Sequence, residues 1–137
     1  MPPADPIRVL VADDSPTALR SVCEYLEFAG GFEIVGTASD GLNAVQLTSL
    51  RKPDLVLLDL SMPRVNGLEA AQQIRLSSPG LRVIIFSELH GLSLADECRR
   101  HGADGFVPKS LLPEGLLMEI QRLFQRSSAK HTGADNN

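Results

Sequence analysis

Five short apolar runs recur along the chain, and longer segments with helical periodicity separate them. The runs are rich in Val, Ile and Leu, and they lie at residues 7–12, 32–37, 54–60, 82–87 and 105–109. The third and fourth runs are apolar almost throughout, which is typical of strands that helices cover on both faces of a parallel sheet. We therefore predict five strands, of which the central ones are fully buried.

The segments between the runs predict five helices. Ser15 is a candidate N-cap with Pro16 in the first turn, and the glycine pair 30–31 ends that helix. Asp40 is a candidate N-cap for the second helix, and the fourth, at about 91–101, is the least apolar. Apolar residues at helical spacing predict the inner faces: Leu19, Val22, Cys23 and Leu26; Leu42, Val45 and Leu50; Leu68, Ala71 and Ile74; Leu94, Ala95 and Cys98; and, in a helix opened by Pro113, Leu116, Leu117, Ile120, Leu123 and Phe124.

Strand and helix alternate five times with short connections. Right-handed crossovers then give an α/β fold with a doubly wound, five-stranded parallel sheet, flavodoxin-like (βα)5, with strand order 2-1-3-4-5. We expect one domain over residues 6–126, preceded by a short extension at 1–5. Residues 127–137 are polar and without periodicity, so we expect a disordered tail too short for an output domain.

Composition narrows the class of protein. A chain of 137 residues with 43% hydrophobic content can bury one core, and its formal net charge of -4 argues against direct binding of nucleic acid. There is no long apolar run, so we expect no membrane insertion and a cytoplasmic location. Cys23 and Cys98 fall among apolar helical neighbours and are predicted to be reduced core thiols.

Five polar side chains fall at the carboxyl ends of the predicted strands, where this fold binds ligands. Asp13 and Asp14 end the first strand, Asp59 comes near the end of the third, and Ser87 and Lys109 end the fourth and fifth. Three neighbouring carboxylates repel one another, and a divalent cation relieves that repulsion. Oxygen ligands with room for water favour Mg²⁺, beside which a Lys and a hydroxyl can hold a phosphoryl group.

Each of these residues also has an ordinary structural interpretation. The Asp pair could simply precede a capped helix, Ser87 could bond locally, and Lys109 could be a solvated charge. Asp59 is the hardest to explain in this way, because it interrupts the apolar run LVLLDL of a buried strand. It is the joint occurrence of all five, on the appropriate strands, that points to a site.

Four blocks of sequence resemble the receiver domains of two-component response regulators. They are VLVADDS at 9–15, LVLLDLSMPRVNGLE at 55–69, VIIFSE at 83–88 and GADGFVPKS at 102–110, within a resemblance that covers roughly 6–126. The resemblance implies a stand-alone, chemotaxis-regulator-like signalling switch rather than an enzyme that turns over a separate substrate. The fifth-strand region, where Ser110 follows the Lys, is similar to receivers fused to helix-turn-helix domains.

The resemblance also implies a role for each site residue. Asp59 would be the phosphoacceptor, Asp14 a direct Mg²⁺ ligand, Asp13 a ligand through water, Ser61 a ligand through its backbone carbonyl, Ser87 the hydroxyl that turns towards the phosphate, Lys109 the cation paired with it, and Phe106 the switch aromatic. Gly67, eight residues after the acceptor, suits a backbone position with positive φ.

The partners follow from the same resemblance. The phosphodonor would be a sensor histidine kinase, a phosphotransfer protein or a small phosphodonor. Phosphorylation would change the surface formed by the fourth helix, fifth strand and fifth helix, which would bind a downstream protein and could support a homodimer.

Glu88 departs from the small residue that the family usually places after the switch hydroxyl. A carboxylate there could crowd or repel a phosphodonor, which motivates an alternative hypothesis of a receiver-like interaction scaffold that acts without phosphorylation. A third hypothesis is a phosphohydrolase with Asp59 as nucleophile. Ser61 stands two residues later, where such an enzyme would need a general acid, so the third hypothesis is the weakest.

Overall fold

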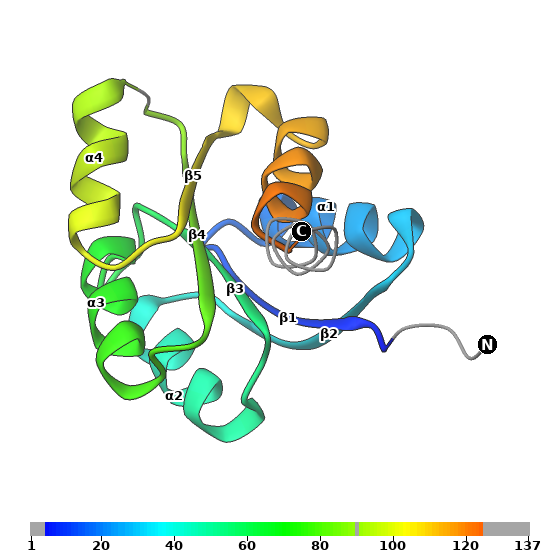
Figure 1. Cartoon of the computed structure of the whole chain (residues 1–137), viewed down its shortest axis with the longest axis horizontal. Helices are drawn as coiled ribbons and strands as arrows, with labels where there is room; N and C mark the ends of the chain where they lie inside the picture. Colours follow the sequence, from blue (N-terminus) through cyan, green and yellow to red (C-terminus); the bar gives the residue numbers. More distant parts are fainter. Residues whose placement is uncertain (1–4, 90, 125–137) are drawn as a thin grey trace, which may run out of the picture.

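Five parallel strands form the central sheet in the order β2-β1-β3-β4-β5 (Figure 1). They are β1 (Ile7–Ala12), β2 (Phe32–Ala38), β3 (Leu55–Asp59), β4 (Arg82–Ser87) and β5 (Gly105–Pro108). The computed structural model describes residues 5–89 and 91–124. Within these ranges the predicted flavodoxin-like topology is confirmed.

Helices cover both faces of the sheet. They are α1 (Pro16–Ala29), α2 (Gly41–Arg51), α3 (Gly67–Ser77), α4 (Leu92–Arg100), a short 3₁₀ helix (Lys109–Leu111) and a last helix over residues 114–124. Figure 1 shows α2, α3 and α4 on one face, with α1 and the last helix on the other. The sheet is therefore the middle of three layers, as its apolar strands predicted.

Alternate residues of each central strand enter two separate cores. In β1, Val9 and Val11 pack towards α1, whereas Leu10 and Ala12 pack towards α2 and α3. The same alternation holds in β3 and β4, because successive side chains of a strand point to opposite faces. Both faces of these strands are thus apolar. A charged side chain in one of them can contact solvent only at the end of the strand.

The helix caps agree with the predicted signals. The Ser15 hydroxyl accepts a hydrogen bond from the Ala18 amide at 3.2 Å, and the Asp40 carboxylate accepts one from the Asn43 amide at 2.8 Å. Gly30 ends α1 with a φ of 80°. These local bonds satisfy backbone groups that the first and last turns of a helix leave unpaired.

Some details of the predicted helices and strands were wrong. Leu50 is 76% exposed instead of lying on the inner face of α2. The stripe that is buried there contains Ala44 and Thr48, and Leu50 follows Thr48 by two residues, about 200° around the helix. Lys109 begins the 3₁₀ helix instead of ending β5, and the last helix begins one residue after Pro113.

The two cysteines lie on opposite faces of the sheet. Cys98 is buried on the inner face of α4, whereas Cys23 in α1 is partly buried on the other side of the sheet, and both are free thiols. Burial raises the pKa of Cys98 to about 11, so this thiol stays protonated and behaves as a core residue. The prediction of two reduced thiols is confirmed.

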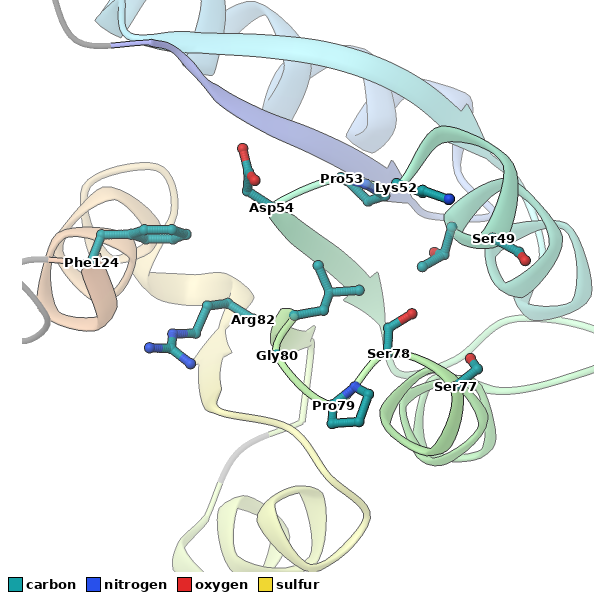
Figure 2. A pocket seen from close by; sticks show the side chains of 12 residues that line it. Ser49, Lys52, Pro53, Asp54, Ser77, Ser78, Pro79, Gly80, Arg82 and Phe124 are labelled. Carbon is teal, nitrogen blue, oxygen red and sulfur yellow. The ribbon is translucent and has the colours of Figure 1, made fainter.

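A hollow lies at the amino edge of the sheet, opposite the acidic side chains. Its volume is about 550 Å³. Figure 2 shows Asp54 and Arg82 at the starts of β3 and β4 on its walls, together with Lys52 and Phe124. No residue of the predicted site lines it.

The remaining predictions about chain organisation concern the termini and membranes. Residues 1–4 of the predicted extension and the whole predicted tail at 127–137 lie outside the described residues. No helix in the part of the chain that the structure describes combines the length and the hydropathy needed to cross a bilayer.

Candidate functional site

The carboxyl edge of the sheet gathers the predicted polar residues. Asp59 and Ser87 are the last residues of β3 and β4, and Asp13 and Lys109 directly follow β1 and β5. Carboxylate oxygens of Asp13, Asp14 and Asp59 lie within 4.8 Å of one another. Asp13 and Asp59 are buried, whereas Asp14 is exposed, so the acidic cluster opens to solvent on one side.

Lys109 is the cation of the acidic cluster. Its Nζ lies 3.0 Å from Asp13 Oδ2 and 3.5 Å from Asp59 Oδ1, and 5.4 Å from the centre of the Phe86 ring. Burial by itself would lower the pKa of Lys109, but the hydrogen bond to Asp13 and the charge of Asp59 raise it above its usual value. The side chain therefore stays charged at the floor of the site.

One positive charge does not balance three carboxylates. Burial, followed by the charge of Asp13, raises the pKa of Asp59 to about 7, although Lys109 acts in the opposite direction. An all-oxygen set of three carboxylates, one of them open to solvent, is what a hard divalent cation such as Mg²⁺ binds. The donor chemistry of this cluster thus fits the predicted metal.

Ser87 is buried beside the acidic cluster, but its hydrogen bond is to the following loop and not to the cluster. Its hydroxyl oxygen accepts a hydrogen bond from the Leu89 amide at 3.0 Å, which ties it to the loop between β4 and α4. No hydrogen bond links Ser87 to Asp59 or Lys109 within residues 5–89 and 91–124. A hydroxyl that moved towards Asp59 would have to release the Leu89 amide.

The loop between β3 and α3 turns tightly after Asp59. The Gly67 amide donates to the Leu60 carbonyl at 2.8 Å, and a Cβ on Gly67 would lie 2.5 Å from the Asp59 carbonyl oxygen. Gly67 does not have the positive φ that was predicted; Arg64 does, at 67°. The glycine is needed for close approach of two backbone segments, not for a left-handed conformation.

Gly67→Ala is expected to reduce the free energy of unfolding by about 2 kcal/mol, because the new methyl group meets backbone atoms that cannot rotate away. Urea denaturation checks this value. Gly80→Ala is the matched control, since a Cβ there meets no atom within 4 Å. An equal effect of the two substitutions would contradict the packing argument.

The other predicted residues do not belong to the acidic cluster. Ser61 and Glu88 are exposed, and Glu88 forms no ion pair with any residue in the described ranges. Phe106 is partly buried against the core beneath α4, and it also lines a hollow with Leu111 and Met118. The roles predicted for Ser61 and Phe106 stay predictions.

Two features of the site were missed from the sequence. Asn66 and Glu69 form a capping box at the start of α3, with hydrogen bonds of 2.9 and 3.2 Å. The Asn-x-x-Glu spacing was the available signal. The second feature is an ion pair of 2.8 Å between Arg64 and Asp40, for which the sequence gives no signal because the residues are far apart in the chain.

Comparison with known proteins is consistent with this geometry. The chain is 34% identical over 118 residues to the nitrate/nitrite response regulator protein NarL of Escherichia coli K12, covering 86% of this chain and 55% of NarL. It is 39% identical over 112 residues to protein-glutamate methylesterase/protein-glutamine glutaminase 4 of Myxococcus xanthus, covering 80% of this chain and 31% of that protein. The chain thus spans about half of the first relative and less of the second.

Solved structures show the same fold. The CheX-CheY-BeF₃-Mg²⁺ complex from Borrelia burgdorferi matches with a TM-score of 0.83 and 30% identity, covering 88% of this chain and 90% of that chain. The response regulator domain of Thermotoga maritima CheB matches with a TM-score of 0.74 and 32% identity, covering 90% and 96%.

The family model of the response regulator receiver domain matches residues 9–121, a range that contains all four sequence blocks and every residue of the acidic cluster. The chain therefore belongs to the response regulator receiver domain family of two-component systems.

Proposed function

We propose that this chain is a phosphorylation-controlled switch in which Asp59 accepts a phosphoryl group in a Mg²⁺-dependent reaction. The observation that carries the proposal is the acidic cluster, where a buried carboxylate at the end of an apolar strand lies 3.5 Å from Lys109. Burying a carboxylate beside two others is costly to the fold even with Lys109 as a partner, so a purely structural role for Asp59 explains it poorly.

The residues that would hold Mg²⁺ are Asp13, Asp14 and Asp59, with the backbone carbonyl of Ser61 as a further ligand. When bound, the metal ion would neutralise negative charge on the incoming phosphoryl oxygens. Asp14 suits direct contact with an ion that keeps part of its hydration shell, since it is the exposed member of the cluster.

Phosphoryl transfer would form an acyl phosphate on Asp59. An oxygen of the ionised carboxylate attacks the phosphorus of a phosphohistidine, a new O–P bond forms, and the N–P bond breaks. The departing imidazole nitrogen keeps the electron pair and takes up a proton from solvent. Lys109, already charged and beside Asp59, would pair with the phosphoryl oxygens.

Switching would begin at Ser87. A phosphoryl group adds acceptor oxygens next to this hydroxyl, which now accepts from the Leu89 amide. Turning towards the phosphate would release that amide, free the loop before α4, and let Phe106 move inward. The altered surface of α4, β5 and the last helix would bind a downstream protein or a second copy of the chain.

The phosphodonor would be a sensor histidine kinase or a phosphotransfer protein. A hollow of about 290 Å³ between α1 and residues 112–116 shares Asp13 and Lys109 with the acidic cluster, and its remaining walls are largely apolar. An apolar side chain of a protein donor could enter it while the donor histidine faces Asp59.

Incubation with acetyl phosphate and Mg²⁺ is expected to add one phosphoryl group per chain, measured by intact mass. Asp59→Asn abolishes the addition, whereas Asp54→Asn, at the other end of β3, leaves it intact. If neither acetyl phosphate nor phosphoramidate modifies the wild type, and amide spectra do not respond to beryllofluoride with Mg²⁺, the proposal fails. The scaffold hypothesis motivated by exposed Glu88 would then take its place.

A further inference from the structure

We propose that Arg64 and Asp40 are positioning residues: their ion pair holds the loop between β3 and α3 in the shape that presents the Ser61 carbonyl and Asp59 to a divalent cation. The inference rests on the proposed function, because it concerns how this chain forms its metal site. Its test is chosen so that the two can fail separately.

Arg64 adopts a backbone conformation that side chains other than glycine avoid. Its φ is 67°, in the left-handed region, where a Cβ crowds the neighbouring carbonyl. A glycine would adopt this turn without strain. A strained residue that persists in a loop beside a site suggests that its side chain contributes something that glycine cannot.

The contribution of the side chain is a contact with the next loop of the same edge. Arg64 Nη2 donates to Asp40 Oδ2 at 2.8 Å. Asp40 is buried, and its other oxygen, Oδ1, accepts the capping hydrogen bond from the Asn43 amide. The cap of α2 is therefore complete without Arg64, so the ion pair mainly serves the loop that carries Arg64.

The packing around the pair joins the two loops closely. A Cβ on Gly41 would lie 1.8 Å from the Val65 carbonyl oxygen, so the loop after β3 rests directly on the first turn of α2. At its other end the same loop is closed by the hydrogen bond from the Gly67 amide to the Leu60 carbonyl. Ser61 lies between these two attachments and is exposed, with no side-chain hydrogen bond within the described residues.

The ion pair and the packing together determine where the Ser61 carbonyl can lie. Asp59 is held in β3 by the sheet, whereas Ser61 lies beyond the strand and is held through its neighbours: the Leu60 amide donates to the Phe86 carbonyl at 2.9 Å, and Met62 is buried in the core. The ion pair holds the part of the loop that follows. Residues that contact the direct ligands of a metal ion orient those ligands. Substituting such a supporting residue weakens metal affinity by about 10- to 100-fold. We expect the smaller value here, because Arg64 lies three residues along the backbone from Ser61 and acts on it only through that segment.

Two substitutions separate this role from a structural one. Arg64→Gly removes the pair and relieves the backbone strain, so thermal stability without metal should be unchanged or higher. Asp40→Asn keeps the cap, since Asn is an equally good N-cap, but removes the charge. In both variants we expect the Mg²⁺ dissociation constant, measured by calorimetry, to rise about tenfold. Amide exchange at Val65 and Gly67 should be faster in the metal-free protein.

Three further variants complete the experiment. The double variant should bind Mg²⁺ no more weakly than either single variant, because both remove one contact. Arg64→Lys keeps the positive charge and should recover part of the affinity. Arg51→Ala removes an equal charge from the far end of α2 and should bind Mg²⁺ as the wild type does.

Two outcomes separate the inference from the proposed function. If the wild type binds Mg²⁺, and both Arg64→Gly and Asp40→Asn keep the wild-type affinity and amide exchange, the inference is overturned and the proposed function stands. A wild type that binds no Mg²⁺ would overturn both.

Discussion

Without divalent cations, raising the pH from about 4 to about 8 is expected to destabilise the wild-type chain by about 3 to 4 kcal/mol relative to Asp59→Asn. The cause is the pKa of Asp59, which burial and then the charge of Asp13 raise to about 7. Between these pH values the folded chain keeps a proton that the unfolded chain has already released.

The sign follows from that difference in bound protons. Where the folded state binds more protons than the unfolded state, the free energy of unfolding falls as pH rises. The loss begins near the ordinary carboxyl pKa of about 4 and is complete above about 7. Asn carries no titrating proton, so the free energy of unfolding of Asp59→Asn does not fall in this way. Asp59→Asn should therefore be the more stable protein at the upper end of the pH range.

Urea denaturation across the pH range, with the two proteins side by side and a chelator present, measures the effect. Glu33→Gln, an exposed carboxyl on β2, is the control and should give a curve parallel to that of the wild type. Adding excess Mg²⁺ should flatten the wild-type curve, because the metal binds only the ionised carboxylate. Parallel curves for the wild type and Asp59→Asn would contradict the account.

Arg75→Ala is expected to reduce the free energy of unfolding by about 3 kcal/mol, a large part of the total stability of a domain. Arg75 extends from α3 into the space between two loops of the amino edge. Nη1 donates to the carbonyls of Pro79 and Leu81 at 2.6 and 2.7 Å. Nε donates to Gly102 at 3.0 Å, and Nη2 donates to Gly102 and to the Asp104 carboxylate.

The expected loss of stability is large because every N–H group of the Arg75 guanidinium donates a hydrogen bond, and few other donors lie near the same acceptors. The Arg75 side chain is only 25% exposed, so removing it takes the donor from several partly buried carbonyls. The Asp104 carboxylate would lose its ion pair and keep the hydrogen bond from the Val83 amide at 2.8 Å. Arg75→Lys should lose most of the same stability, since an ammonium cannot reproduce the planar fork.

Chemical denaturation of Arg75→Ala, Arg75→Lys and Arg20→Ala tests this explanation. Arg20 is exposed on α1 and has no ion pair among the residues described, so its loss should change stability by no more than about 0.5 kcal/mol. Equal stabilities of Arg75→Ala and Arg20→Ala would show that the hydrogen bonds of Arg75 contribute nothing net.

The elements that were predictable from the sequence are those with a local cause. Strands β1 and β4 begin and end where the apolar runs do, and a charged residue, Asp13 or Glu88, directly follows each of them. Ser15, Gly30 and Asp40 cap their helices as predicted, because a cap depends on groups within three or four residues. The prediction that Leu50 lies on the inner face of α2 was wrong, because hydrophobicity alone does not say which of several apolar residues faces the sheet.

The candidate site was predictable in membership but not in geometry. Parallel strands place their carboxyl ends at one edge, so Asp13, Asp59, Ser87 and Lys109 had to be neighbours once the topology was known. That Lys109 bonds to Asp13 more closely than to Asp59, and that Ser87 bonds to Leu89, depends on side-chain positions that no spacing encodes.

The sequence by itself determined the order of strands and helices and the identity of the acidic cluster, because periodicity, caps and residue type are local properties of a chain. Only the tertiary structure decided the contacts between distant segments. Arg64 and Asp40 are separated by more than twenty residues, and Arg75 and Asp104 by still more, yet each pair forms an ion pair. The fold brings such residues together, and their energies therefore depend on packing that neither residue specifies.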